Sequence, residues 1–141
     1  GVGGARIVSR QIDTCALGFE PGHQIINYTK GVAETLEQFV SGTAIEEHYQ
    51  KKPFELDDVT AWDEIARQLS VGLINTIVHW SPDIVILGGS VTQKIPIEKV
   101  GADVARLLTI FPQGVPIAKA TLGDSGGLYG AIEYLQARHL Q

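Results

Sequence analysis

The stretch "WSPDIVILGGSV", residues Trp80–Val91, carries the clearest indication of the fold in this sequence. Ser81-Pro82 predicts the end of a helix, because proline disfavours helical geometry in the residue before it. "DIVILGG" then forms a continuous apolar run, which is typical of a strand buried on both faces of a parallel sheet. We therefore expect a helix, a buried strand and a glycine turn in that order.

The segment before this stretch has the spacing of an amphipathic helix. Its apolar positions fall on one helical face. They are Trp62, Ile65, Ala66, Leu69, Leu73, Thr76, Ile77 and Trp80. Thr60 followed by Asp63 resembles a capping box, which would bind the first free N–H groups of this helix.

Short apolar alternations dominate the N-terminal part. "GARIVSRQIDTCALG" predicts two antiparallel strands joined by a tight turn at Ser9-Arg10. "QIINY" predicts one more strand, after a loop that contains glycine and proline. Residues 33–49 have near-helical spacing, and Gly42 interrupts them, so we expect a helix with a bend or break near Ser41-Gly42.

The C-terminal part alternates between helix and strand patterns. "PIEKVGADVARLLTIF" predicts a helix, "VPIAKATLG" a strand, and "DSGGLYGAIEYLQARHL" a terminal helix opened by Asp124 or Ser125. In that helix Gly127, Gly130 and Ala131 would allow close packing against a neighbour. Strands followed by alternating helices and strands predict an α/β fold, with a mixed sheet flanked by helices, in a single domain covering residues 1–141.

Composition excludes several classes of protein. The chain has 141 residues, 44% of them hydrophobic, and a formal net charge of -5, and its basic residues do not gather into a stripe that could follow nucleic acid. Neither a membrane span nor a signal peptide is expected. The single cysteine, Cys15, excludes an internal disulfide and is expected to be a small buried residue. A cytoplasmic location is the default expectation.

Two glycine-rich turns could approach a ligand closely. Gly1, Gly3 and Gly4 expose backbone N–H groups that could bind phosphate oxygens, although a simple turn or a flexible end would have the same composition. Gly88 and Gly89 follow the predicted buried strand, where a ligand can approach the carboxyl edge of an α/β sheet. A plain turn is the alternative there.

A loop with the pattern E-x-G-H contains Glu20 and His23, and Glu37 follows in the first predicted helix. Carboxylates and imidazole form directional hydrogen bonds, as recognition of adjacent sugar hydroxyls requires. The alternative is a loop held by its own polar side chains. The other histidines, His48, His79 and His139, show no such grouping and are expected on the surface or along helices.

Five motifs occur in one order: "GVGGARIV", "GFEPGHQ", "LEQFVSG", "WSPDIVILGGSV" and "ATLGDSGGLYGA". Together they resemble the C-terminal half of the ROK family, which comprises sugar kinases and sugar-responsive repressors of the actin-like ATPase superfamily. The resemblance covers essentially the whole chain. It implies a ribonuclease H-like fold that packs against an N-terminal half, with nucleotide and sugar in the cleft between them.

The resemblance also implies roles for particular residues. The turn at Gly1, Gly3 and Gly4 would lie near the ATP phosphates, and Gly88 and Gly89 near the adenosine. Glu20, His23 and Glu37 would bind hydroxyls toward the anomeric end of a hexose. The family's catalytic aspartate belongs to the N-terminal half, so no catalytic residue is expected in this chain, which alone should be inactive.

A structural zinc ion is not expected. Most ROK proteins have a C-x-C-G-x-x-G-C-L-E element, whose cysteines bind zinc together with the E-x-G-H histidine. Aligning that element on Gly31 and Leu36-Glu37 places Tyr28, Lys30 and Thr35 at the cysteine positions. One histidine without thiolates cannot complete a tetrahedral zinc site.

The resemblance leaves three functions open. The first is an ATP- and magnesium-dependent sugar kinase, similar to glucokinases or fructokinases and expected to form a homo-oligomer. The second is the sugar-sensing module of a ROK repressor, which would require an upstream helix-turn-helix for nucleic-acid binding. The third is an interaction domain that has kept the fold and lost its ligands.

Overall fold

The computed structural model describes residues 1–14, 17–111 and 113–139, so the prediction for Cys15 falls outside the described residues. The helices are α1 (Glu37–Val40), α2 (Gly42–Tyr49), α3 (Val59–Trp80), α4 (Ile97–Leu107) and α5 (Gly126–His139). The strands are β1 (Ile7–Val8), β2 (Gln11–Ile12), β3 (Ile25–Thr29), β4 (Val32–Thr35), β5 (Val85–Leu87) and β6 (Ile117–Lys119). Short 3-10 turns lie at Pro21–His23, Pro53–Glu55, Ser90–Gln93 and Gly123–Ser125.

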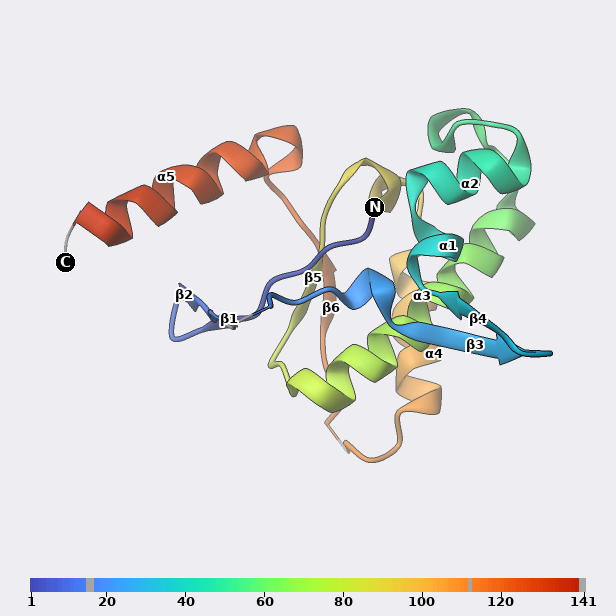
Figure 1. Ribbon diagram of the computed structural model, residues 1–141, viewed down its shortest axis with the longest axis horizontal. Helices are drawn as coiled ribbons and strands as arrows, with labels where there is room; N and C mark the ends of the chain where they lie inside the picture. Colours follow the sequence, from blue (N-terminus) through green and yellow to red (C-terminus); the bar gives the residue numbers. More distant parts are fainter. Residues whose placement is uncertain (15–16, 112, 140–141) are drawn as a thin grey trace.

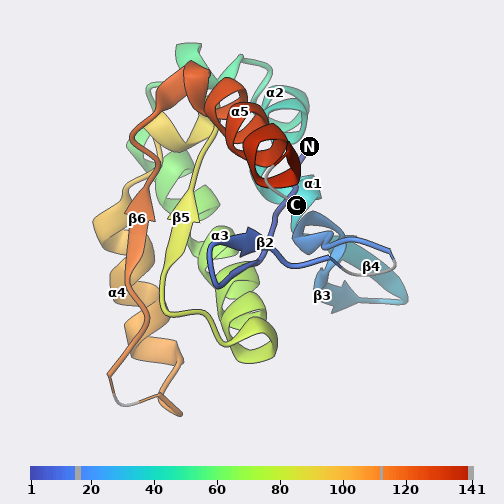
Figure 2. The same ribbon diagram turned by 90° about the vertical axis from the view of Figure 1, so that its left-hand side faces the viewer.

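The strands pair in three separate two-stranded sheets. β1 and β2 form one antiparallel hairpin, β3 and β4 form a second, and β5 and β6 run parallel. The β1–β2 and β3–β4 hairpins project on different sides of the central helices (Figure 1). Figure 2 shows β5 and β6 side by side, next to α4. The predicted α/β class is confirmed, whereas the strands of the described residues form three small sheets in place of the predicted single mixed sheet.

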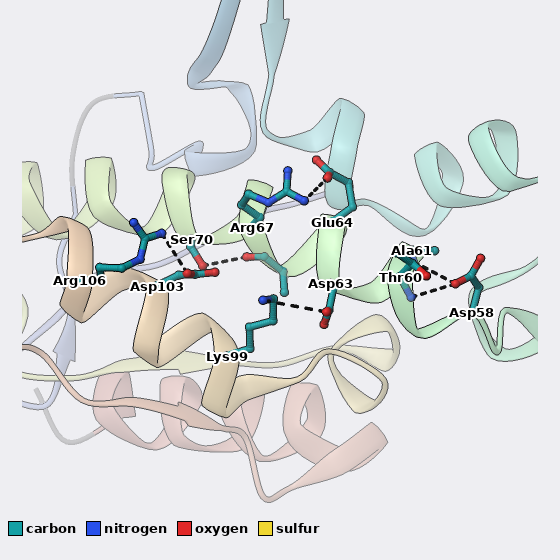
Figure 3. Close-up of polar contacts among 11 residues, drawn as sticks. Asp58, Thr60, Ala61, Asp63, Glu64, Arg67, Ser70, Lys99, Asp103 and Arg106 are labelled. Carbon is teal, nitrogen blue, oxygen red and sulfur yellow. Dashed lines mark hydrogen bonds and ion pairs between the residues drawn. The ribbon is translucent and has the colours of Figure 1, made fainter.

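The core is built around α3, which packs against α4 and α1. Its apolar stripe is buried as predicted at Trp62, Ile65, Ala66, Leu69, Leu73 and Ile77. Ser70 is also fully buried, and its hydroxyl donates a 2.8 Å hydrogen bond to the carbonyl of Ala66 (Figure 3). Val100 and Val104 of α4 are buried in the same core cluster. A rigid helical layer therefore supports the loops described below.

The capping-box prediction for α3 was wrong. Asp58 is the N-cap, and its carboxylate accepts hydrogen bonds from the backbone N–H groups of Thr60 at 2.8 Å and Ala61 at 3.3 Å (Figure 3). Asp63 instead lies 4.0 Å from the ammonium group of Lys99 on α4. The helix starts one residue before Thr60 because the upstream aspartate already satisfies its free N–H groups.

The predicted helix over residues 33–49 was also partly wrong. Residues 32–35 form β4, which pairs with β3, and helical structure begins only at Glu37. The cause is the Lys30-Gly31 turn, where both residues have positive φ angles of 52° and 81°. Two consecutive left-handed residues reverse the chain into a hairpin. The predicted break at Ser41 is confirmed, since α1 ends at Val40 and the Ser41 hydroxyl caps α2.

The strand prediction at residues 83–89 was right in position and wrong in burial. Val85 and Leu87 pack against the core, whereas the side chain of Ile86 is 62% exposed. The reason is that β5 pairs with β6 in a two-stranded sheet, and helices cover the face that carries Val85 and Leu87. In larger parallel sheets helices normally cover both faces, so the side chains on both faces are buried.

The terminal helix α5 begins after a 3-10 turn at Gly123–Ser125, close to the predicted start. It extends away from the rest of the molecule (Figure 1). Gly127 and Gly130 have no neighbouring atoms within 4 Å of an added Cβ, so their predicted close packing has no counterpart among the described residues. No helix in the described part of the chain is both long enough and apolar enough to span a membrane.

Candidate functional site

Glu37 is placed by the packing of its neighbour Leu36 on α3. A Cβ on Gly72 of α3 would lie only 2.5 Å from Cδ2 of Leu36, so the glycine makes room for the buried leucine. The backbone N–H of Leu36 also donates a 3.0 Å hydrogen bond to the carbonyl of Gln24. Glu37, the first residue of α1, is therefore fixed between α3 and the E-x-G-H loop.

The E-x-G-H loop is attached to α3 by apolar and polar contacts. The Phe19 ring packs against Trp80 with ring centroids 4.6 Å apart. The Gln24 amide group donates hydrogen bonds to the carbonyl of Pro21 at 2.7 Å and to the Thr76 hydroxyl at 3.3 Å. Both ends of the loop are thereby tied to the core helix.

The predicted sugar ligands Glu20 and His23 flank the short 3-10 turn of this loop, and both are exposed. The backbone N–H of His23 donates a 3.1 Å hydrogen bond to the carbonyl of Glu20. Because this bond uses main-chain atoms, it fixes the separation of the two residues and leaves their side chains for a ligand.

The predicted glycine-rich turn at residues 1–4 has no turn assigned to it in the structure; the segment, still called the glycine turn below, packs directly on this loop. A Cβ on Gly22 would lie 2.2 Å from the carbonyl oxygen of Val2, and one on Gly4 would lie 2.8 Å from Cγ of Pro21. Real Cβ atoms essentially never come this close, so a side chain at Gly22 would displace the backbone of Val2, and one at Gly4 would displace the Pro21 ring. The third position of E-x-G-H is therefore required by its contact with the turn.

The turn is also bound to Glu37. The backbone N–H of Val2 donates a 2.6 Å hydrogen bond to Oε2 of Glu37. A Cβ on Gly1 would lie 3.0 Å from the same oxygen. The structure thus brings together three predicted elements from distant parts of the sequence: the glycine turn, the E-x-G-H loop and Glu37.

An open cavity of about 570 Å³ lies beside Glu37. Its lining comprises Gly1, Glu37, Gln38, Ser41, Thr43, Ala44, Glu47 and His48. Glu20 and His23 are not among these residues. The cavity is mostly polar and offers both hydrogen-bond donors and acceptors, which suits a hydroxylated ligand.

Sequence reasoning missed several polar residues of this region. Gln24 ties the loop to α3, and Gln38, Glu47 and His48 line the cavity. His48 had been expected on the surface, and it is exposed there with its ring 4.6 Å from that of Tyr49. Helical spacing from Ala44 to Glu47 and His48 was the available signal, because residues three and four apart share a helix face.

The predicted adenosine-binding glycines lie at the end of β5. Gly89 has a φ angle of +96°, and its carbonyl accepts a 2.6 Å hydrogen bond from the Thr92 hydroxyl. A Cβ on Gly88 would lie 3.4 Å from Cβ of Ala120, which follows β6. Gly88 and Gly89 do not line the cavity beside Glu37, so they form a second, separate part of the candidate site.

The three positions aligned with zinc-binding cysteines do not form a metal site. Tyr28 and Lys30 are exposed on the β3–β4 hairpin, and the Thr35 hydroxyl is hydrogen-bonded to Gln38. Within residues 1–14, 17–111 and 113–139, no group of three or more His, Cys, Asp and Glu side chains could hold a metal ion. A phenol, an ammonium group and a hydroxyl beside one histidine do not fit zinc.

Comparison with known proteins identifies structures with the same fold. The chain has the fold of a ROK hexokinase from Thermus thermophilus (25% identity, TM-score 0.80), covering 99% of this chain and 55% of that one. A ROK family protein from Streptococcus pneumoniae, solved in complex with sucrose, covers 100% of this chain and 57% of its own length at 22% identity and a TM-score of 0.79.

A ROK family glucokinase from Streptomyces griseus, solved in complex with glucose and AMPPNP, covers 92% of this chain and 55% of its own length (20% identity, TM-score 0.69). The chain thus spans a little over half the length of these structures. No curated protein sequence matches it.

The solved structures are sugar kinases and a ROK protein of the actin-like ATPase fold, so the predicted fold is confirmed. The ROK family model matches residues 1–138. Both the fold and the sequence pattern therefore lead to one conclusion: this chain belongs to the ROK family and has a sugar kinase-like fold.

Proposed function

We propose that this chain is the C-terminal domain of a ROK sugar kinase that transfers the γ-phosphate of ATP to a hexose hydroxyl. The observation that carries the proposal is the convergence of Glu37, Gly22 and the glycine turn, joined by the 2.6 Å hydrogen bond between Val2 and Glu37. A group that binds sugar and a turn that binds phosphate must be neighbours in such an enzyme, because the phosphoryl group moves directly between the two ligands.

Each part of the site has a role in this proposal. Glu20, His23 and Glu37 bind sugar hydroxyls. The turn at Gly1, Gly3 and Gly4 provides backbone N–H groups for the phosphates of a magnesium–nucleotide complex. Gly88 and Gly89 allow the adenosine to approach β5. The relatives crystallised with glucose and AMPPNP, or with sucrose, support sugar and nucleotide as ligands.

The domain is proposed to work with an N-terminal half that supplies the catalytic aspartate. Exposed apolar side chains support an additional packing partner. On α5 they include Leu128, Tyr129, Ile132 and Leu135, and at β5 they are Ile86 and the preceding residue Ile84. Large apolar side chains that gather on an exposed surface often mark a protein-protein contact. The whole protein is proposed to be a cytoplasmic homo-oligomer.

This proposal predicts that the 141-residue chain alone has no measurable sugar-kinase turnover. A positioned general base contributes on the order of 10²–10⁴-fold to the rate, and part of the phosphate clamp would be missing as well. The measurement is coupled detection of ADP release with several hexoses, and the longer protein is the positive control. Robust hexose-dependent ADP formation by the chain alone would contradict the assignment of the base to another domain.

A second prediction concerns sugar recognition by Glu20. In the longer protein, Glu20→Gln should weaken hexose binding by about tenfold or more, because a hydrogen bond to a charged group contributes roughly 1.5–3 kcal/mol. Calorimetric titration of glucose and fructose measures the loss. Glu46→Gln is the matched control, with the same change of charge at an exposed residue of α2 that belongs neither to the E-x-G-H loop nor to the cavity lining.

Equal hexose affinities for the wild type, Glu20→Gln and Glu46→Gln would show that Glu20 only fastens the loop. Hexose binding by the longer protein without any ATP turnover would instead identify a sugar-sensing module and overturn the kinase proposal.

A further inference from the structure

The carboxylate of Glu37 has two neighbours of different kinds. Its Oε2 atom accepts the 2.6 Å hydrogen bond from the Val2 backbone N–H, across 35 positions of sequence. The same side chain also lines the polar cavity, next to Gln38 and Ser41. Charge-assisted hydrogen bonds of this length are among the stronger ones in proteins. Glu37 is therefore a structural support of the turn as well as a cavity residue.

The glycines around this bond indicate that the turn is held in one position. A Cβ added to Gly1 would lie only 3.0 Å from Oε2 of Glu37, and Gly22 lies directly against the carbonyl of Val2. The turn is thus confined between the carboxylate on one side and the E-x-G-H loop on the other. A shift of Glu37 would remove one of these two supports.

One carboxylate can serve both neighbours at the same time. It offers two oxygens and about four lone-pair positions, and the bond from Val2 uses one of them. The remaining positions can accept hydrogen bonds from a ligand in the cavity while Oε2 continues to hold the turn. A simple competition between the turn and a sugar is therefore not required by the geometry.

We propose that Glu37 is a positioning residue of the glycine-rich turn and sets the geometry in which Gly1, Gly3 and Gly4 bind nucleotide phosphates. This inference rests on the proposed kinase function and extends the role of Glu37 beyond sugar recognition. Backbone N–H groups bind an anion well only when they already point toward it, so a turn that has lost its support must be ordered by the nucleotide.

The test measures nucleotide binding in the absence of sugar. AMP-PNP with magnesium is titrated calorimetrically into the longer protein as wild type, Glu37→Ala, Glu37→Asp, Glu37→Gln and Glu46→Ala. Glu37→Asp keeps the charge and withdraws it by one methylene group. Glu37→Gln keeps an oxygen at the same distance, which can still accept the Val2 hydrogen bond.

The expected result is about tenfold weaker AMP-PNP binding for Glu37→Ala and Glu37→Asp, the scale of one hydrogen bond to a charged group. Glu37→Gln should restore most of the affinity. Glu46→Ala is the matched control, because it also removes a carboxylate, from an exposed position on α2 outside the cavity lining. Its AMP-PNP affinity should equal that of the wild type.

The outcomes separate this inference from the proposed function. Unchanged AMP-PNP affinity in Glu37→Ala or Glu37→Asp, with normal binding by the wild type, would overturn the positioning role and leave the kinase proposal intact. The absence of AMP-PNP binding by the wild type would overturn both. A loss of AMP-PNP affinity in Glu37→Gln together with retained affinity in Glu37→Asp would show that the charge of residue 37, and not the hydrogen bond to Val2, supports nucleotide binding, and would also overturn the positioning role.

Discussion

Gly22 shows how a single hydrogen atom in place of a side chain can determine the site. Gly22→Ala would place a methyl group 2.2 Å from the carbonyl oxygen of Val2, so the turn or the loop must move. We expect the substitution to lower the free energy of unfolding by about 1–3 kcal/mol, the usual cost of overpacking. Denaturant unfolding of the two proteins measures the difference.

Gly3→Ala is the control for this substitution. An added Cβ on Gly3 has no neighbour within 4 Å, and its φ angle is not in the left-handed region, so stability should change little. Equal losses for Gly22→Ala and Gly3→Ala would mean that the contact between loop and turn has no energetic importance.

At this scale the motifs selected the candidate residues but did not reveal the contacts that those residues make. Glu20, His23, Glu37 and the glycines could be selected from motifs. The contact of Gly22 with Val2 could not, because periodicity and turn propensity describe only neighbours along the chain. The position of Glu37 beside the turn depends on how Leu36 packs against Gly72, and this packing exists only in the folded core.

At the scale of elements, the start of α3 depends on one aspartate. The pKa of Asp58 lies below its ordinary value, first because of a side-chain hydrogen bond from Thr60 and then because of the backbone N–H groups of Ala61 and Thr60. A lowered pKa in the folded state means that the cap stabilises the protein above the ordinary carboxyl pKa of about 4. This stability is lost as the pH falls below that value.

Asp58→Ala should therefore lower the melting temperature at pH 7 and have a smaller effect at pH 3. Asp58→Asn, which still caps but does not titrate, should remove part of the acid dependence. Thermal unfolding followed by circular dichroism at several pH values tests both. A larger loss for Thr60→Ala than for Asp58→Ala would favour the capping box with Asp63.

Elements with long, regular patterns were predictable, and short ones were less so. Helix α3 is 22 residues long, and its end at Ser81-Pro82 was correctly predicted. β4 has only 4 residues, so too few positions alternate to separate a strand from the start of a helix. The burial of β5 was overestimated because its sequence does not reveal how many strands join the sheet.

The whole molecule is expected to fold without zinc. Tyr28, Lys30 and Thr35 provide no thiolate at the positions aligned with cysteines, and Gln24 and Phe19 already attach the loop to α3. Protein purified without added metal should contain much less than one zinc per chain by elemental analysis. Its melting temperature should not change with a chelator.

A zinc-dependent relative treated in the same way provides the control, because metal binding is part of the folding free energy in such proteins. Stoichiometric zinc in this protein, or unfolding by the chelator, would refute the prediction. It would also require ligands other than those three positions.

The close contact between Val2 and Gly22 also limits how this site can be transplanted or can change during evolution. The turn and the loop approach closely because Gly22 has no side chain, and the carboxylate of Glu37 binds the turn. Replacing any one of the three segments alone would therefore leave a clash or an unfilled gap. A designer who grafts the E-x-G-H loop onto another scaffold must transfer the glycine turn and the first residue of α1 with it. The three segments therefore have to be kept together, although they lie at separate places in the sequence.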